Sequence, residues 1–279
     1  MRQRPFLIVD VFTAEAYAGN PLAVVLDGEG LTTDEMQRFA NWMNLSETSY
    51  LLRPTNAAAD YRVRIFTPTL ELPFAGHPTL GSCHAWLASG EKPAHPDHVV
   101  QECGAGLITV RPGSGRLAFA APPLVRSGRV DEALVGRVAG ILGIDRGEVV
   151  EAQWVDNGPG WVAVRLADAN AVLAVRPGFV EELDIGVVGM YPPGSPFAYE
   201  VRGFFPKNGV TTEDPVTGSL NASLAQWLLR SGQVTAPYVA SQGTAVERAG
   251  RVHITWDGDD SDVWVGGSTV TCVTGTVDL

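Results

Sequence analysis

Two stretches of the chain repeat one another, and this internal repeat limits the folds that the sequence can adopt. Residues 71–90 read ELPFAGHPTLGSCHAWLASG, and residues 213–232 read EDPVTGSLNASLAQWLLRSG. They align without a gap at an offset of 142, about half of the 279-residue chain. Each stretch has a proline, a glycine turn, a run of small and apolar residues, and a final Ser-Gly that is typical of a helix C-terminus. We therefore predict a duplicated half, with one apolar helix in each copy. The identical pairs are Glu71/Glu213, Pro73/Pro215, Gly76/Gly218, Leu87/Leu229, Ser89/Ser231 and Gly90/Gly232.

The N-terminal ends of these two helices are candidate binding sites. One helix begins with Gly76-His77 and the other with Gly218-Ser219. The first backbone N–H groups of a helix lack an intrahelical partner, so such an end attracts anions. If the halves face each other across a pseudo-twofold axis, both ends would converge on a cleft suited to a substrate carboxylate or an oxyanion. The alternative is that the two stretches are only buried core helices of two similar domains.

Composition excludes several classes of function. A hydrophobic fraction of 45%, a charged fraction of 18% and the lack of a long apolar run are typical of a globular protein without a membrane span. The formal net charge of -11, with no cluster of Lys or Arg, disfavours nucleic acid as a partner. Cys83, Cys103 and Cys272 are scattered outside any disulfide or metal-ligand pattern. We therefore expect a cytoplasmic protein with no metal site.

The first half reads as strands and one amphipathic helix before the first copy of the repeat. Residues 6–12 and 22–26 predict two strands joined by a turn, and residues 61–67 alternate as a further strand. Thr32 and Glu35 have capping-box spacing, and apolar residues recur at helical spacing up to residue 43. We expect this helix to pack on the sheet by one face and to end near residue 44.

Glu47 stands on a short polar link between that helix and the next strand. Apolar residues precede and follow it. Partial shielding from water would favour the protonated carboxyl and suit proton exchange near neutral pH. The alternative is a glutamate on a surface loop, or one that bonds to nearby backbone N–H groups.

The second half repeats the order of the first. Pro122-Pro123 marks a domain boundary. Residues 131–142 predict a helix that mirrors the helix ending near residue 44, and residues 161–166 predict a strand that mirrors 22–26. We expect an N-terminal domain of residues 1–122, completed by 268–279, and a C-terminal domain of residues 123–267.

Five motifs together resemble the PhzF-like isomerases of phenazine biosynthesis. They span most of the chain in the right order: GNPLAVV at 19–25, NLSETSY at 44–50, FTPTLELPFAGHPTLGS at 66–82, EDPVTGS at 213–219 and the looser QG(x4)RxG at 242–250. The resemblance implies an α/β (α+β) fold of the diaminopimelate epimerase type. Such a fold has two pseudo-symmetric domains, each a twisted mixed sheet around a central hydrophobic helix, with the active site between them. It also implies a homodimer.

The resemblance also implies roles for individual residues. Glu47 would be the catalytic acid/base, and His77 and Asp214 would assist proton movement. Five further residues of these motifs would bind the substrate carboxylate: Ser46, Gly76, Thr217, Gly218 and Ser219. Other readings remain open, because Asp214 and Ser219 suit helix caps and His77 suits a satisfied polar group at a domain interface.

The function implied is a cofactor-independent proton shift on a small carboxylic acid, with trans-2,3-dihydro-3-hydroxyanthranilate as the family's namesake substrate. The related two-thiol epimerases place a cysteine in each glycine turn. This sequence has none there, and Cys83 lies about two turns inside the first helix. The alternatives are an epimerase or isomerase of another amino acid derivative, and a carboxylate-binding protein that kept the fold without the chemistry.

Overall fold

The structure is a computed structural model that describes residues 2–207, 209–258 and 262–279. Its chain divides into two compact units, the first of Met1–Ala120 with Gly266–Leu279 and the second of Ala121–Val265. The sequence-based boundaries were placed after residues 122 and 267. No helix in the described ranges is both long and apolar enough to span a bilayer.

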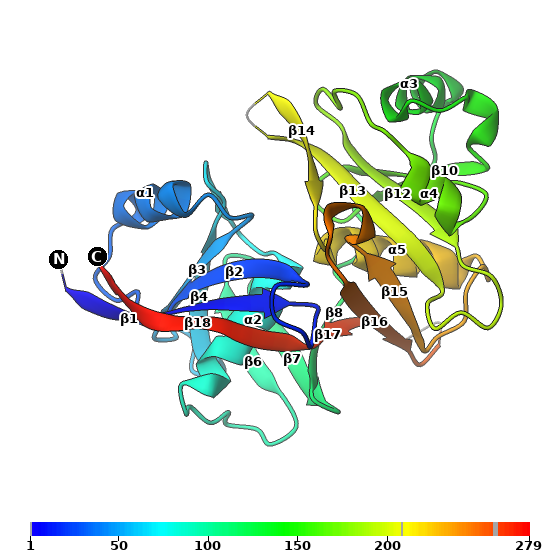
Figure 1. Cartoon of the computed structure of the whole chain (residues 1–279). Helices are drawn as coiled ribbons and strands as arrows, with labels where there is room; N and C mark the ends of the chain where they lie inside the picture. Colours follow the sequence, from blue (N-terminus) through cyan, green and yellow to red (C-terminus); the bar gives the residue numbers. More distant parts are fainter. Residues whose placement is uncertain (1, 208, 259–261) are drawn as a thin grey trace. The chain divides into compact units, whose positions relative to one another are not determined.

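The first unit is a mixed sheet with two helices (Figure 1). The strand order is β18–β1–β2–β3–β4–β6–β7–β8, and β5 shares the outer edge of β4 with β6. Its elements are β1 (Gln3–Val11), β2 (Asn20–Val25), α1 (Thr33–Met43), β3 (Thr48–Leu52), β4 (Tyr61–Phe66), β5 (Glu71–Leu72), α2 (Gly76–Ala88), β6 (Val99–Cys103), β7 (Gly106–Gly113), β8 (Arg116–Ala120) and β18 (Thr269–Asp278).

The second unit repeats this arrangement. Its strand order is β9–β10–β11–β12–β13–β15–β16, and β14 shares the outer edge of β13 with β15. Its elements are β9 (Arg126–Arg129), α3 (Glu132–Leu142), η1 (Arg146–Glu148), β10 (Glu151–Asp156), β11 (Trp161–Arg165), α4 (Ala169–Ala174), β12 (Asp184–Met190), β13 (Tyr199–Lys207), β14 (Val210–Asp214), α5 (Gly218–Arg230), β15 (Tyr238–Gln242), η2 (Thr244–Val246) and β16 (Gly250–Trp256). The chain then passes through β17 (Val263–Gly267), which spans the boundary between the units.

The two predicted apolar helices are the central helices of the two units. α2 and α5 each have thirteen residues, of which ten are buried, and their limits differ by the same 142 residues as the sequence repeat. Each helix connects a parallel pair of strands, β4 and β6 for α2 and β13 and β15 for α5. α2 packs against seven strands of its sheet, so the sheet wraps around it. The predicted fold class, a twisted mixed sheet around a central helix in each half, is confirmed.

The outer helices do not correspond as the sequence suggested. The predicted helix at 131–142 is present as α3, with Asp131 accepting a capping bond from the N–H of Leu134. It lies between β9 and β10, however, whereas α1 connects the parallel strands β2 and β3. The true counterpart of α1 is the six-residue helix α4, which connects the parallel strands β11 and β12. The prediction that residues 131–142 mirror α1 is therefore wrong, because an apolar face does not reveal which strands a helix joins.

Local signals in the first half agree with the structure. The Thr32–Glu35 capping box is formed, and Asn44 ends α1 in the left-handed conformation. β1 and β2 are an antiparallel pair, as the turn between them predicted. The C-terminal strand β18 pairs antiparallel with β1, and Arg2 and Leu279 exchange two backbone hydrogen bonds of 2.7 and 3.1 Å (Figure 1).

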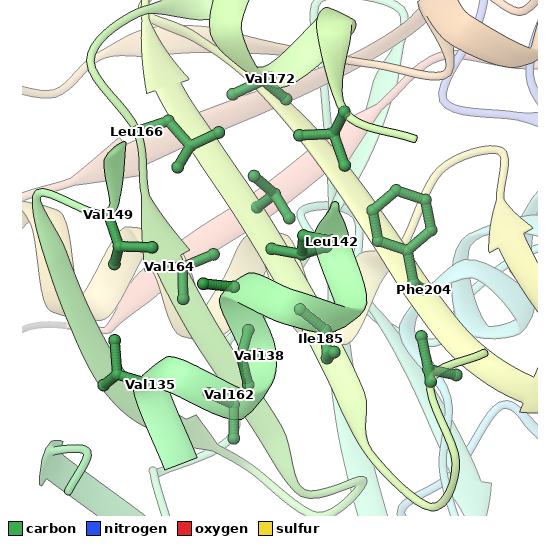
Figure 2. Close-up of a cluster of buried hydrophobic side chains, with 14 residues drawn as sticks. Val135, Val138, Leu142, Val149, Val162, Val164, Leu166, Val172, Ile185 and Phe204 are labelled. Carbon is green, nitrogen blue, oxygen red and sulfur yellow. The ribbon is translucent and has the colours of Figure 1, made fainter. Parts of the chain in front are cut away.

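A second hydrophobic layer covers the other face of each sheet. In the second unit α3, α4 and strands β11 to β13 enclose fourteen buried apolar side chains, among them Leu142, Ile185 and Phe204 (Figure 2). In the first unit Met36 and Ala40 of α1 pack on a smaller cluster of sheet residues. Each sheet therefore has a buried helix on one face and amphipathic helices on the other.

The duplication extends to an ion pair that joins the two strands preceding each central helix. Arg64 and Glu71 form two hydrogen bonds of 2.7 and 2.6 Å, and Arg202 and Glu213 form two of 2.9 and 2.7 Å. Each arginine lies over the ring of the phenylalanine two residues later, and that phenylalanine is the strand partner of the glutamate. The pair in the second unit is the more buried, with side-chain exposures of 6% and 11% against 25% and 37%.

The small residues of α2 allow the sheet to approach, and a substitution at one of them tests this. A Cβ added at Gly81 would lie 2.5 Å from Leu22 Cδ2, 3.0 Å from Val11 Cγ2 and 3.1 Å from Val9 Cγ2. We expect Gly81→Ala to lower the free energy of unfolding by about 1–3 kcal/mol. Gly136 of α3 has nothing within 4 Å of such a Cβ. There, Gly136→Ala should raise stability by about 0.5–1 kcal/mol, since only helix propensity changes. Urea denaturation of both variants decides, and equal effects would contradict the close packing.

The two ion pairs should differ in their contribution to stability. Arg202 also donates to the carbonyl oxygens of Val172 and Val175 at the end of α4, so Arg202→Met removes both donors of a buried carboxylate and one bond to each of two carbonyls. We expect it to cost about 3–5 kcal/mol. Arg64→Met, at the half-exposed pair, should cost about 1 kcal/mol or less. A loss of stability for Arg64→Met as large as that for Arg202→Met would show that burial does not determine how much each ion pair contributes to stability.

Candidate functional site

Glu47 and His77 lie next to each other in the first unit. Glu47 directly precedes β3, after the left-handed Asn44 has turned the chain away from α1. His77 is the second residue of α2. The Nδ1 atom of His77 lies 2.9 Å from Oε2 of Glu47, and the two side chains are only 4% and 17% exposed. A carboxylate and an imidazole at this distance can share a proton, which is the basis of general acid–base catalysis.

Polar atoms of this pair remain available to a ligand. The contact between Nδ1 and Oε2 is close but is not aligned as a hydrogen bond. Oε2 of Glu47 and Nε2 of His77 are both buried and have no hydrogen-bond partner among the described residues. Buried polar atoms are usually satisfied, so two such atoms on neighbouring side chains favour a ligand group at this pair.

The N-terminus of α2 adds backbone donors to the same unit. Ala75 is the N-cap residue and makes no side-chain capping bond. Gly76 follows, and a Cβ there would lie 2.4 Å from the ring of Phe119, so glycine is required. Ser46 is half-buried on the link beside Glu47. This part of the first unit therefore combines a carboxylate with an imidazole and a helix N-terminus, and the last two favour a negatively charged ligand group.

The second unit holds the remaining predicted site residues around the start of α5. The hydroxyl of Thr217 donates to Oδ2 of Asp214 at 2.8 Å, and both residues are buried. Thr217 is the N-cap residue of α5 and, like Ala75, makes no side-chain capping bond to the helix. The N-cap position of α5 that the sequence left open for Asp214 is therefore occupied by Thr217.

Ser219 is oriented by two residues that the sequence did not single out. Trp161 Nε1 donates to Ser219 Oγ at 3.0 Å, and Asn157 Nδ2 donates to the Ser219 carbonyl at 3.1 Å. Because its oxygen accepts from the indole, the Ser219 hydroxyl keeps its proton for another acceptor. No local motif connects these residues, which are about sixty positions apart in the sequence.

The Cys83 thiol lies inside a central helix. Cys83 is buried in α2, and burial raises the pKa of its thiol to about 12. A thiol in that state is a poor base and nucleophile. In the described part of the chain, no three His, Cys, Asp or Glu residues are grouped so that they could hold a metal ion.

Two carboxylates lie at the end of the sheet that carries Trp161. Asp184 begins β12 as the strand partner of Trp161, and Asp156 ends β10, where it accepts from the N–H groups of Gly158 and Gly160 at 2.7 and 2.8 Å. Burial, followed by repulsion from Asp156, raises the pKa of Asp184 to about 7. No sequence motif identifies Asp184, since its neighbours come from other strands.

Asp184 should make stability depend on pH. The pKa is higher in the folded than in the unfolded chain, so the folded state binds the proton more tightly and its stability falls as pH rises from about 4 to about 7. Asp184→Asn should therefore stabilise the fold at pH 8, by at most about 4 kcal/mol, and change it little at pH 3. Urea unfolding across this range is the measurement, and a stabilisation that is the same at pH 3 and pH 8 would count against the assignment.

Comparisons with known proteins agree with this architecture. A family model described as phenazine biosynthesis-like protein matches residues 9–275. A Schizosaccharomyces pombe protein named antisense-enhancing sequence 1 is 34% identical, with 99% of each chain covered. The trans-2,3-dihydro-3-hydroxyanthranilate isomerase of Pseudomonas aeruginosa is 32% identical over 91% of this chain and 90% of its own. A PhzF family protein of Bacillus anthracis superimposes over the whole of both chains with a TM-score of 0.84 at 23% identity. The chain therefore belongs to the PhzC/PhzF family of phenazine biosynthesis-like proteins.

Proposed function

We propose that the protein moves a proton between two carbon atoms of a small carboxylic acid, with Glu47 as the group that carries the proton. That the protein is an isomerase follows from its family. The assignment of the base depends on one observation, the 2.9 Å approach of Glu47 Oε2 to His77 Nδ1 in a buried place where both side chains keep a polar atom without a partner.

The enzyme ends the proposed reaction in the protonation state in which it began. The Glu47 carboxylate removes a proton from one carbon, and the electron pair of the broken C–H bond shifts along the conjugated system of the substrate. The resulting carboxylic acid exchanges its proton with water and then protonates a second carbon, which forms the new C–H bond. His77, next to Glu47, would stabilise the carboxylate when it is charged and orient it for both transfers.

The helix N-termini are proposed to bind the substrate carboxylate. Gly76 and Gly218 are the first residues of α2 and α5, so their backbone N–H groups precede the first intrahelical bonds. The Ser219 hydroxyl, whose oxygen accepts from Trp161, is a further donor at the start of α5. Ser46 and Thr217 are proposed as further binding residues, and Asp214 is proposed to assist proton movement.

The substrate is proposed by similarity. Trans-2,3-dihydro-3-hydroxyanthranilate is the substrate in the name of the Pseudomonas aeruginosa relative at 32% identity. It is a small carboxylic acid with an allylic proton, so it meets the chemical requirements of the proposed site. Another acid of the same size with a labile C–H bond would meet them as well.

A deuterium-labelling experiment tests both parts of the proposal. Wild-type protein is incubated in deuterated water with trans-2,3-dihydro-3-hydroxyanthranilate, and mass spectrometry follows substrate loss and label. We expect turnover with incorporation of deuterium. Glu47→Gln should lower the rate by at least about a hundredfold, since general acid–base catalysis contributes about 10²–10⁴.

The control is Glu91→Gln, a change of the same kind at an exposed loop position in the same unit. It should leave the rate unchanged. If wild type turns over and folded Glu47→Gln keeps full activity, Glu47 is not the base. If wild type gives no turnover and no label, the substrate is wrong, and a panel of small carboxylic acids in deuterated water then separates an isomerase from a protein that only binds carboxylates.

A further inference from the structure

Gln242 is a fully buried residue at the end of β15, and its backbone is held on both sides. It pairs with Val201 of β13 and with Gly250 of β16. The next residue, Gly243, has a φ of 96°, and a Cβ there would lie 2.6 Å from the carbonyl oxygen of Pro215. This end of β15 therefore lies directly against the loop that carries Asp214 and Thr217.

The orientation of the Gln242 amide is determined by backbone groups. Its Oε1 accepts from the backbone N–H of Thr217 at 2.9 Å and from Asn221 Nδ2 at 2.7 Å. Its Nε2 donates to the backbone carbonyl of Asp214 at 3.2 Å and to Thr217 Oγ1 at 2.8 Å. A backbone N–H can only donate and a backbone carbonyl can only accept, so the two ends of the amide cannot be exchanged.

This orientation also determines the direction of the Thr217 hydroxyl. Its oxygen accepts from Gln242 Nε2, and its single proton is directed to Asp214 Oδ2, 2.8 Å away. A hydroxyl that donates to a carboxylate favours the ionised form of that carboxylate. In this chain of hydrogen bonds Gln242 therefore donates to Thr217, and Thr217 donates to Asp214.

We propose that Gln242 is a positioning residue that keeps Asp214 ionised, as a hydrogen-bond acceptor, by orienting the Thr217 hydroxyl so that it donates to the Asp214 carboxylate. The relevance to catalysis rests on the proposed function, in which Asp214 assists the reaction. Within that function the two carboxylates differ: Glu47 exchanges its proton, whereas Asp214 stays charged and accepts hydrogen bonds.

The first unit has a similar glutamine that lacks this effect. Gln101 of β6 accepts from the Tyr61 hydroxyl at 2.9 Å and donates to Thr79 Oγ1 at 3.0 Å. Thr79 in turn donates to the backbone carbonyl of Ala75 at 2.9 Å. That chain ends on a carbonyl, because the N-cap residue of α2 is alanine and has no hydroxyl. Gln101 is therefore a matched control, equally buried and also bonded to a central helix.

The charged groups around Asp214 in the second unit do not change in this comparison. Glu213 beside it is paired with Arg202 of β13, and the strand partner of Asp214 is Gly203. The first two turns of α5, residues 218–224, carry no charge. After β15, Arg248 is directed to the carbonyls of Val246 and Glu247, at 3.5 and 3.3 Å. A shift in the titration of Asp214 on removing an uncharged side chain therefore reports on its hydrogen bonds.

The test is a carbon-13 NMR titration of the aspartate carboxyl groups, with Asp214→Asn used to assign the signal. Gln242→Met and Thr217→Val should each increase the protonation constant of Asp214 about tenfold or more, since a hydrogen bond to a charged group is lost. The double variant should shift it no further than Thr217→Val alone, because Gln242 acts through Thr217. Gln101→Met should leave it unchanged.

Two results would overturn the proposal. One is a titration of Asp214 in folded Gln242→Met or Thr217→Val that matches wild type. The other is a double variant whose shift is the sum of the two single shifts, because Gln242 would then act directly. If Gln242→Met does not fold, Thr217→Val still decides, since it removes only the hydroxyl. The titration needs no substrate, so an absence of turnover would contradict the proposed function alone.

Discussion

The architecture of each unit depends on burying a helix on nearly all sides. Such a helix needs small residues where strands approach, and Gly76 and Gly81 provide them in α2. It also needs partners for the polar groups at its two ends. Ser89 and Ser231 bond back to helix carbonyls at the C-terminal ends, at 2.7 and 2.8 Å. The N-cap residues make no side-chain capping bond. Carbonyl groups at the C-terminal end of each helix are therefore bonded to a serine hydroxyl. The N-terminal end keeps its backbone N–H donors, and the candidate site residues lie there.

Duplication gave the two units the same frame and different chemistry. His77 and Ser219 occupy the same place in the two repeats, and so do Ala75 and Thr217. The first unit places an imidazole beside a carboxylate, and the second places hydroxyls beside one. Positions that hold the frame, such as the prolines and glycines that start each helix, are identical. Positions that face the start of each helix have diverged, so the two halves contribute different functional groups.

Much of the fold was predictable from the sequence, because its strongest signals are local. The offset of 142 residues gave the limits of both central helices, and the Thr32–Glu35 spacing gave the start of α1. The pairing of α3 with α1 failed because periodicity identifies a buried face and not the strands that a helix connects. The short helix α4, the true counterpart, has six residues and too few turns to show a period.

The candidate site was predictable only in part. Motifs identified Glu47, His77 and Asp214, and the structure brings the first two together. The groups that orient the site, such as Trp161 against Ser219 and Gln242 against Thr217, meet through strand pairing over tens of residues. Nothing in the sequence near Trp161 or Asp184 indicates such a partner. Hydrogen bonds between distant segments depend on register, which the sequence alone does not give.

The pairing of β18 with β1 has a consequence for how the protein is made. The second unit is continuous in sequence, and all of its residues leave the ribosome before β18 does. Its last strand therefore emerges before the strand that completes the first unit. The first unit, although translated first, keeps one edge of β1 uncovered until the final strand arrives. An uncovered strand edge is a template for wrong pairing, so this interval is the stage of biosynthesis at which the nascent chain is most exposed to aggregation.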